Sequence, residues 1–235
     1  MKALYFDGCF NKYINPETEN AVKSILFGCD IQLVKKNFEC CGVSFLNDGN
    51  LAEFQKIIQK NLSVIDCEYD YILTDCASCQ YVLSQYKDFC SDGLALEVSS
   101  KLINVLDLIQ NIKFSAKSNF NVAIHLPCHE KFDLKSMVKN ISNISFIDVE
   151  YYDMCCGFSG TFAVKNNDIS VEISKTKAKK YLEQDLDFVL TTCPACVLGL
   201  EQGFIEAQSP RMKKPKVMNL IVFLAKYCNI DGFIS

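Results

Sequence analysis

The chain has 235 residues, of which 49% are hydrophobic and 22% are charged, and its net charge is −4. This length allows one large domain or two small ones, and the composition suits a globular protein with a sizeable core. The weak negative charge and the lack of a basic run argue against nucleic acid as a partner.

The N-terminal sequence MKALYFDGCF lacks the apolar stretch and small-residue cleavage site of a signal peptide. The longest apolar segment, residues 217–224, is much shorter than the roughly 20 residues that a membrane span requires. We therefore expect a cytoplasmic protein with no membrane span of its own. Any membrane attachment would come through a partner.

Cysteine is the unusual feature of the composition. The chain contains 14 cysteines and only two histidines. A reducing cytosol disfavours structural disulfides, so clustered cysteines in such a protein indicate metal or redox chemistry. Two histidines are too few for a mixed Cys/His zinc framework to explain the rest.

Ten of the cysteines form two copies of one pattern: a single Cys, then Cys-Cys-Gly, then Cys-x-x-Cys. The first copy is Cys9, Cys40, Cys41, Cys76 and Cys79, and the second is Cys128, Cys155, Cys156, Cys193 and Cys196. The three parts of the pattern recur at offsets of 119, 115 and 117 residues. Nearly constant offsets indicate an internal duplication.

The elements expected in the first half begin with a β-like run that ends at Cys9. The apolar periodicity of 51–62 predicts a helix, a second β-like run leads to Cys76, and a further helix is expected near 101–112. The polar stretch 113–121 follows and is the expected boundary region. We therefore expect two domains, residues 1–117 and 118–235.

The second half repeats this order. Apolar runs lead to Cys128 and Cys193, a lysine-rich helix is expected over 171–182, and a last strand and helix over 216–228 should dock onto this half. Short apolar strands that alternate with helices predict a parallel sheet covered on both faces. The expected fold class is α/β, with two tandem pseudo-symmetric parallel repeats.

Ligands of parallel α/β sheets bind beyond the carboxyl ends of the strands, which is where the motif cysteines are expected. Each half would bring five thiolates to one edge, and thiolates are soft ligands for iron–sulfur clusters, zinc or copper(I). The glycine after each Cys-Cys pair allows a close turn, and each Cys-x-x-Cys precedes a helix whose N-terminal amides favour negative charge. A tetrahedral zinc site needs only four ligands, so five sulfurs with two adjacent favour a multi-iron cluster. Structural zinc remains the alternative.

The doubled motif resembles the cysteine-rich CCG-domain family, which includes the B subunit of heterodisulfide reductase and the iron–sulfur subunits of glycolate oxidase, anaerobic glycerol-3-phosphate dehydrogenase and the lactate-utilisation complex. The resemblance implies one four-iron, four-sulfur cluster per repeat, non-cubane where all five cysteines are present. The implied ligands are Cys9, Cys40, Cys41, Cys76 and Cys79 for the first cluster and Cys128, Cys155, Cys156, Cys193 and Cys196 for the second. The sequence departs from an exact repeat, because 26 residues separate Cys128 from Cys155 and 30 separate Cys9 from Cys40.

The two histidines flank Cys128 in the sequence HLPCH. We expect His125 to be a structural residue of a strand. His129 is the candidate catalytic residue, because it could donate a proton to a reduced substrate or a hydrogen bond to a cluster sulfur. The four cysteines outside the motif lack counterparts between the halves and are expected to be structural; they are Cys29, Cys67, Cys90 and Cys228.

Three functions follow from these patterns. The first is an iron–sulfur electron-transfer subunit of a multi-subunit oxidoreductase, which the resemblance links to a 2-hydroxy acid such as lactate or glycolate. No ferredoxin-like cysteine run is present in the sequence, so the expected partner is a flavoprotein or a ferredoxin-like subunit. The second is a catalytic subunit of the heterodisulfide-reductase type, which cleaves a disulfide between two clusters. The third is a non-enzymatic metal or redox-sensing module.

Overall fold

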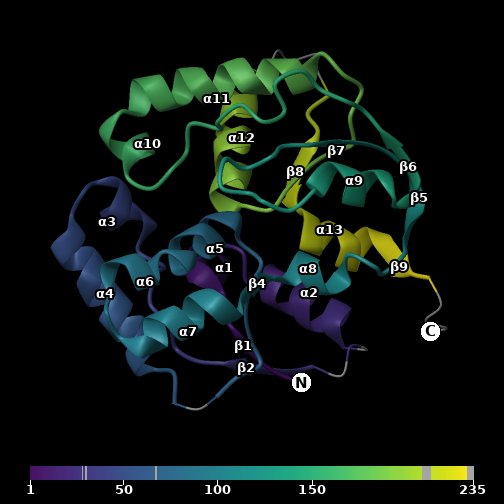
Figure 1. The fold of residues 1–235 in the computed structure, drawn as a ribbon. Coiled ribbons are helices and arrows are strands. Elements are labelled where there is room, and N and C mark those ends of the chain that lie inside the picture. Colours follow the sequence, from purple (N-terminus) through teal and green to yellow (C-terminus); the bar gives the residue numbers. More distant parts are fainter. Residues whose placement is uncertain (28, 30, 67, 208–212, 232–235) are drawn as a thin grey trace. The chain divides into compact units, whose positions relative to one another are not determined.

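The computed structural model describes residues 1–27, 29, 31–66, 68–207 and 213–231. The chain divides into two compact units, Met1–Leu108 and Ile109–Ser235, whose elements are labelled in Figure 1. Within these described ranges, no helix is both long enough and apolar enough to cross a membrane.

The first unit is built on a sheet of four parallel strands in the order β2-β1-β3-β4. The strands are β1 (Lys2–Tyr5), β2 (Gln32–Lys35), β3 (Tyr71–Thr74) and β4 (Leu102–Asn104). The helices are α1 (Gly8–Tyr13), α2 (Glu17–Leu26), α3 (Val43–Asn47), α4 (Leu51–Ser63), α5 (Ala77–Ser84), α6 (Tyr86–Phe89) and α7 (Gly93–Lys101), and α8 (Val105–Ile109) crosses the division between the units.

The second unit is built on parallel strands in the order β6-β5-β7-β8, with β9 added antiparallel to β5. The strands are β5 (Phe114–Ile124), β6 (Ser142–Phe146), β7 (Phe188–Thr191), β8 (Lys216–Asn219) and β9 (Cys228–Ile230). The helices are α9 (Leu134–Lys139), α10 (Phe162–Lys165), α11 (Asn167–Leu182), α12 (Pro194–Ala207) and α13 (Leu220–Tyr227).

The two sheets share one strand order, because β5, β6, β7 and β8 take the places of β1, β2, β3 and β4. The expected α/β class with two tandem parallel repeats is therefore confirmed. The terminal strand and helix expected over 216–228 are also confirmed as β8 and α13, and β8 pairs with β7. Among the residues that the structure describes, the antiparallel strand β9 has no counterpart in the first sheet.

The longest helix of the first unit follows directly from its sequence. The Asn50 side chain accepts a hydrogen bond from the Glu53 N–H and so caps the first turn of α4. Phe54, Ile58 and Leu62 recur at helical spacing on one face and are buried. The helix predicted over 51–62 is thus confirmed, and the helix predicted over 171–182 is confirmed as α11, which begins about one turn earlier.

The helix expected near 101–112 is wrong at its start and forms only over Val105–Ile109, as α8. Residues 102–104 form β4 instead, which pairs in parallel with β3 from Ile72↔Leu102 to Thr74↔Asn104. The Asn104 side chain then accepts a hydrogen bond from the Leu106 N–H, which starts the short helix α8. Tertiary pairing with a buried strand outweighs the local helical pattern at this point.

The polar stretch 113–121, expected as a boundary region, lies within the 11-residue strand β5 apart from Lys113. Its first residues pair with β9, with Phe114 opposite Ile230 and Ala116 opposite Cys228. The expected division at 117/118 falls inside this strand, and the compact units divide at Leu108/Ile109.

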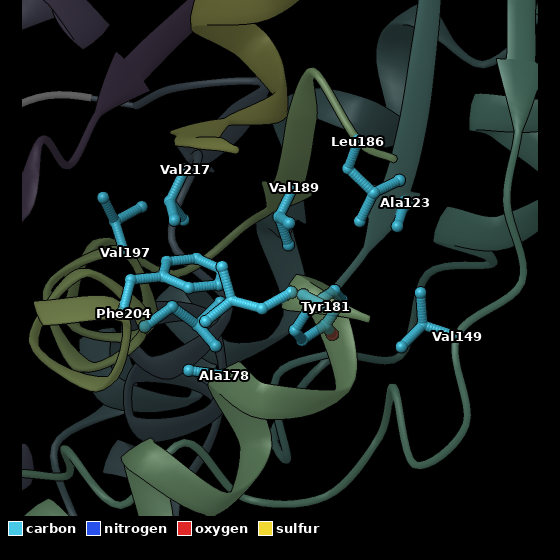
Figure 2. Close-up of a cluster of buried hydrophobic side chains, with 11 residues drawn as sticks. Ala123, Val149, Ala178, Tyr181, Leu186, Val189, Val197, Phe204 and Val217 are labelled. Atoms are coloured by element: carbon cyan, nitrogen blue, oxygen red, sulfur yellow. The ribbon is translucent and has the colours of Figure 1, made fainter. Parts of the chain in front are cut away.

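The core of the second unit shows how its helices position the sheet. Figure 2 shows Ala123, Val189 and Val217 from the strands facing residues of α11 and α12. The helical members of this cluster are Ala178, Tyr181, Leu182, Val197, Leu200 and Phe204. The Tyr181 hydroxyl donates to the Ile124 carbonyl at 2.9 Å, so the one polar group in this core is satisfied and α11 is fixed to β5.

The close approach of α11 and α12 depends on a glycine. A Cβ at Gly203 would press on the Ser174 carbonyl and lie 3.1 Å from the Ala178 Cβ. We therefore predict that Gly203→Ala lowers the free energy of unfolding by about 1–3 kcal/mol, as expected for overpacking. Thermal denaturation should show a drop of about 2–4 °C per kcal/mol.

Gly93→Ala is the matched control, because a Cβ at Gly93 meets no atom within 4 Å. Equal midpoints for the two variants would contradict this account of helix packing.

Candidate functional site

The motif cysteines of the first unit lie beyond the carboxyl ends of three strands. Cys9 is in α1, directly after β1, and Cys40 and Cys41 lie in the loop from β2 to α3. Cys76 follows β3 as the residue before α5, and Cys79 is in the first turn of that helix. One edge of the sheet therefore holds all five residues.

The five sulfurs of the first unit form one continuous cluster. The Cys9 and Cys40 Sγ atoms are 3.4 Å apart. Cys41 hydrogen-bonds to both Cys40 and Cys79, and Cys79 also hydrogen-bonds to Cys76. The structure thus brings together every sequence-predicted ligand of the first repeat.

The second unit repeats this arrangement after β5, β6 and β7. Cys155 hydrogen-bonds to Cys128 and Cys156, the Cys156 and Cys196 Sγ atoms are 3.3 Å apart, and Cys196 hydrogen-bonds to Cys193. The five predicted ligands of the second repeat therefore also gather in one cluster. The loop that is shorter by four residues does not separate Cys128 from Cys155.

Hydrogen bonds lower the pKa of the first cysteine of each Cys-Cys pair in both units. Hydrogen bonds from Cys41 and Cys9, with the Gly42 N–H, lower the pKa of Cys40 to about 3. Hydrogen bonds from Cys128 and Cys156, with the Gly157 N–H, lower the pKa of Cys155 to about 2. Because metal ligands must be deprotonated, each cluster contains a thiolate prepared for a metal.

The glycine of each Cys-Cys-Gly turn is required by both conformation and space. Gly42 and Gly157 have φ values of +93° and +79°, a region that L side chains rarely adopt. A Cβ at Gly42 would lie 2.7 Å from the Phe54 ring in α4, and a Cβ at Gly157 would lie 2.8 Å from the Ser170 carbonyl in α11. The absence of a side chain at these two positions therefore lets α4 and α11 pack directly against the turns.

His125 differs from the expectation of a fully satisfied strand residue. It directly follows β5 and is 1% exposed. Its Nδ1 lies 3.1 Å from the Tyr152 carbonyl, whereas Nε2 is buried and has no hydrogen-bond partner among the described residues. One ring nitrogen lies within 4.8 Å of the sulfurs of Cys156 and Cys196, and burial lowers the pKa of His125 to about 3. The His125 imidazole is therefore neutral, and one of its ring nitrogens lies at the edge of the second cluster, where it could bind a metal.

His129 is half-buried beside the same cluster. Burial lowers the pKa of its imidazole, and the thiols of Cys193 and Cys155 act on it in the opposite direction. The structure thus places the candidate catalytic histidine near the sulfurs of Cys193 and Cys155.

Three polar residues near the clusters were missed by the sequence reasoning. Asp75 is buried directly before Cys76 and accepts hydrogen bonds from the Tyr5 hydroxyl at 2.7 Å and the Asn11 amide at 2.6 Å. Asn61 and Lys177 are buried on α4 and α11. The sequence carries no simple signal for this pair, because the Cys-Cys-Gly turns recur at an offset of 115 residues, which would align Asn61 with Thr176. Only the packing of α4 and α11 on the two glycines shows the offset of 116 residues.

The four cysteines outside the motif do not join these clusters where they are described. The Cys29 thiol donates a weak hydrogen bond to the Ile25 carbonyl at 3.9 Å, and Cys228 is buried in β9. Cys90 is half-buried after α6, and Cys67 lies outside the described residues.

The donor set fits a group that prefers sulfur. Each unit offers five cysteines from three separate segments, and in the second unit Cys128 and Cys155 remain exposed while the other three are buried. Soft thiolates in this number suit iron–sulfur clusters. A four-coordinate zinc ion would leave one thiol of each cluster without a metal bond.

Comparison with known proteins defines the class of this chain. The family model of the CCG cysteine-rich domain matches residues 3–84 and 122–201, which contain all ten motif cysteines. The chain therefore belongs to the CCG cysteine-rich domain family, with two copies of the domain in tandem.

Two named relatives cover nearly the whole chain. It is 27% identical over 228 residues to the B subunit of fumarate reductase (CoM/CoB) from Methanothermobacter marburgensis, which covers 94% of this chain and 45% of that protein. It is 24% identical over 237 residues to lactate utilization protein A of Bacillus cereus, which covers 94% of this chain and 97% of that protein. The chain spans about half the length of several curated relatives that it matches.

A solved structure shares the fold. A hypothetical protein from Helicobacter pylori superposes with a TM-score of 0.66 over 95% of this chain and 48% of that protein, at 9% sequence identity. This likeness shows that the arrangement of elements recurs in a protein of very different sequence.

Neighbouring cysteines differ in exposure and in pKa, so we expect their thiols to be alkylated at different rates. Only an accessible thiolate reacts rapidly with iodoacetamide. We predict that, in the metal-free reduced protein, Cys155 is alkylated at least about tenfold faster than Cys156, whose thiol is buried and whose pKa is raised to about 12. Mass spectrometry of timed samples measures both rates.

Cys228 is the internal control, because it is buried and its pKa is likewise raised to about 12 by burial. It should react as slowly as Cys156. Equal rates for Cys155 and Cys156 would contradict the placement of these two side chains.

Proposed function

We propose that each unit binds one iron–sulfur cluster through its five clustered cysteines, and that the chain carries electrons as a subunit of a larger oxidoreductase. The observation that carries this proposal is the gathering of five thiols in each unit, with the same connections among them. A duplicated structural metal site would need fewer sulfurs.

The first cluster would be held by Cys9, Cys40, Cys41, Cys76 and Cys79, and the second by Cys128, Cys155, Cys156, Cys193 and Cys196. When bound, the group supplies one-electron storage and transfer. The N–H groups of Gly42 and Gly157 donate to the sulfurs of Cys40 and Cys155 at 3.5 and 3.3 Å. Hydrogen bonds to cluster sulfurs favour the reduced, more negative state.

Two helices add to this electrostatic support. Cys76 and Cys193 each stand directly before a helix, α5 and α12 respectively, so the N-terminal end of a helix lies next to each of these thiols. The positive end of the helix dipole favours the negative charge that thiolates and bound sulfides bring.

The substrate class and the partners follow from the relatives. Similarity to lactate utilization protein A over nearly its full length supports a complex that oxidises a 2-hydroxy acid such as lactate or glycolate. A flavoprotein or a ferredoxin-like subunit would deliver the electrons, and this chain would pass them on. This assignment rests on analogy between proteins of one fold.

His129 is the candidate proton donor in this proposal. Its ring lies beside Cys155 and Cys193, where it could donate a hydrogen bond to a sulfur or a proton to a reduced substrate. It is therefore the side chain that we assign to proton delivery at the second cluster.

The proposal is tested by metal analysis of the full chain after anaerobic iron–sulfide reconstitution. We predict roughly eight iron and eight sulfide per chain, as two four-iron clusters require. The double variants Cys40→Ser/Cys41→Ser and Cys155→Ser/Cys156→Ser should each lose about half of both. Cys228→Ser, which removes a buried cysteine outside the motif, should lose neither.

Electron paramagnetic resonance on the same samples shows whether the remaining cluster is intact. Zinc without sulfide in the wild-type chain would contradict the redox proposal and favour a structural or sensing module.

A second candidate function is disulfide cleavage by this chain itself. It is favoured by the completeness of both five-cysteine sets, since a mechanism in which each cluster captures one sulfur needs two full sites.

This candidate predicts turnover without other subunits. The reconstituted chain, supplied with a reduced one-electron dye under anaerobic conditions, should reduce a small disulfide, and either double cysteine variant should abolish the reaction. Dye that stays reduced in the presence of two intact clusters would leave electron transfer as the function.

A further inference from the structure

The internal duplication allows the surroundings of the two thiol clusters to be compared position by position. The helix that covers each Cys-Cys-Gly turn packs on its glycine in the same register. Phe54 and Ile57 lie nearest to a Cβ at Gly42, and Ser170 and Ile173 lie nearest to a Cβ at Gly157. Both pairs are separated by 116 residues, so α4 and α11 are equivalent with this offset.

At the same offset, Asn61 on α4 corresponds to Lys177 on α11. Asn61 is 2% exposed; its Nδ2 donates to the Cys40 carbonyl at 3.0 Å and its Oδ1 accepts from the Glu39 N–H at 2.8 Å. Lys177 is 1% exposed, and its Nζ donates to the Tyr151 and Tyr152 carbonyls at 2.8 and 3.1 Å. Both side chains therefore fix the backbone that leads into the Cys-Cys pair.

The two residues differ in charge. The hydrogen-bond partners of the Lys177 ammonium are neutral carbonyls, and the thiols of Cys156, Cys196 and Cys155 favour its charged form. Burial lowers the pKa of Lys177 to about 8, so the amine is mostly protonated at pH 7. Lys177 itself is 1% exposed, and Figure 2 shows its neighbours on α11, Ala178 and Tyr181, packed into the core.

We propose that Lys177 raises the reduction potential of the second cluster above that of the first, because it places a buried positive charge where the first unit has the neutral amide of Asn61. The inference rests on the proposed function, since it requires a cluster in each unit. Reduction adds one electron to the cluster and breaks no bond; a flavin or cubane cluster of the partner supplies that electron. A nearby cation in a medium of low polarity stabilises the added negative charge.

A second pair of equivalent positions acts in the same direction. Asp75 and Thr192 stand directly before Cys76 and Cys193, and both are buried. The first cluster thus has a carboxyl beside it where the second has a hydroxyl. The acidic groups near the second site are Asp153, which acts on Lys177, and the half-buried Glu130, which hydrogen-bonds to Thr192. The second site therefore has acidic neighbours as well. Among the two pairs of equivalent residues, Asn61/Lys177 and Asp75/Thr192, only Lys177 is a cation.

The experiment is an anaerobic redox titration of the reconstituted full chain, followed by electron paramagnetic resonance. The double variants Cys40→Ser/Cys41→Ser and Cys155→Ser/Cys156→Ser each leave one cluster and so assign the two steps. We expect the second cluster to be reduced first. Lys177→Gln should lower its reduction equilibrium constant about tenfold, which is 59 mV for a one-electron couple, and should leave the first cluster unchanged.

Two further variants separate charge from structure. Lys177→Arg keeps the charge and should retain most of the wild-type potential. Lys179→Gln removes an exposed charge from the same helix and should shift the potential much less than Lys177→Gln. A second cluster that is reduced after the first in the wild-type chain would overturn the inference even if Lys177→Gln failed to fold.

The outcomes also distinguish this inference from the function on which it rests. A loaded second cluster whose potential does not move in Lys177→Gln would overturn the inference alone. A second unit that takes up no iron and sulfide would overturn the proposed function, and the inference with it.

Discussion

The structure depends on gathering five ionisable thiols at the edge of a small sheet, with three of the five cysteines of each unit buried. Each thiol cluster draws its members from three segments that follow three neighbouring parallel strands. The Cys-Cys-Gly turns leave no room for a side chain at the glycine, because α4 and α11 lie directly against Gly42 and Gly157. Buried thiols repel one another once ionised, and in each unit one thiolate is stabilised by its neighbours and by a backbone N–H. This partial compensation leaves both sites suited to a positively charged metal centre.

The two units share their backbone arrangement and their cysteine positions, but they differ in the buried polar residues around the sulfurs. Strand order, the glycine turn, the sulfur connections and the Cys-x-x-Cys at a helix start are common to both units. The buried groups around the sulfurs are not, since Asn61 and Asp75 are replaced by Lys177 and Thr192. Two copies of one binding geometry can therefore differ in electrostatic potential at little structural cost. For an electron-transfer protein, such a difference gives the electron a direction.

The sequence predicted the features that repeat and missed those that depend on tertiary pairing. The cysteine offsets and the apolar face of Phe54, Ile58 and Leu62 were readable because they follow fixed periods. The helix expected near 101–112 was wrong at its start because β4 forms only where β3 offers backbone partners. The polar residues after Lys113 were taken for a boundary because their pairing with β9 joins segments more than 100 residues apart. The lysine-rich helix expected over 171–182 gave no sign that Lys177 is buried, because nothing local distinguishes it from the exposed Lys179.

The central claim is that both five-cysteine clusters hold iron and sulfide. The most direct test is anomalous X-ray scattering at the iron edge from crystals of the anaerobically reconstituted chain, with a second data set at the zinc edge. The account predicts two separate groups of iron peaks, one enclosed by Cys9, Cys40, Cys41, Cys76 and Cys79 and the other by Cys128, Cys155, Cys156, Cys193 and Cys196. A single zinc peak in each cluster, or iron bound away from these sulfurs, would contradict it.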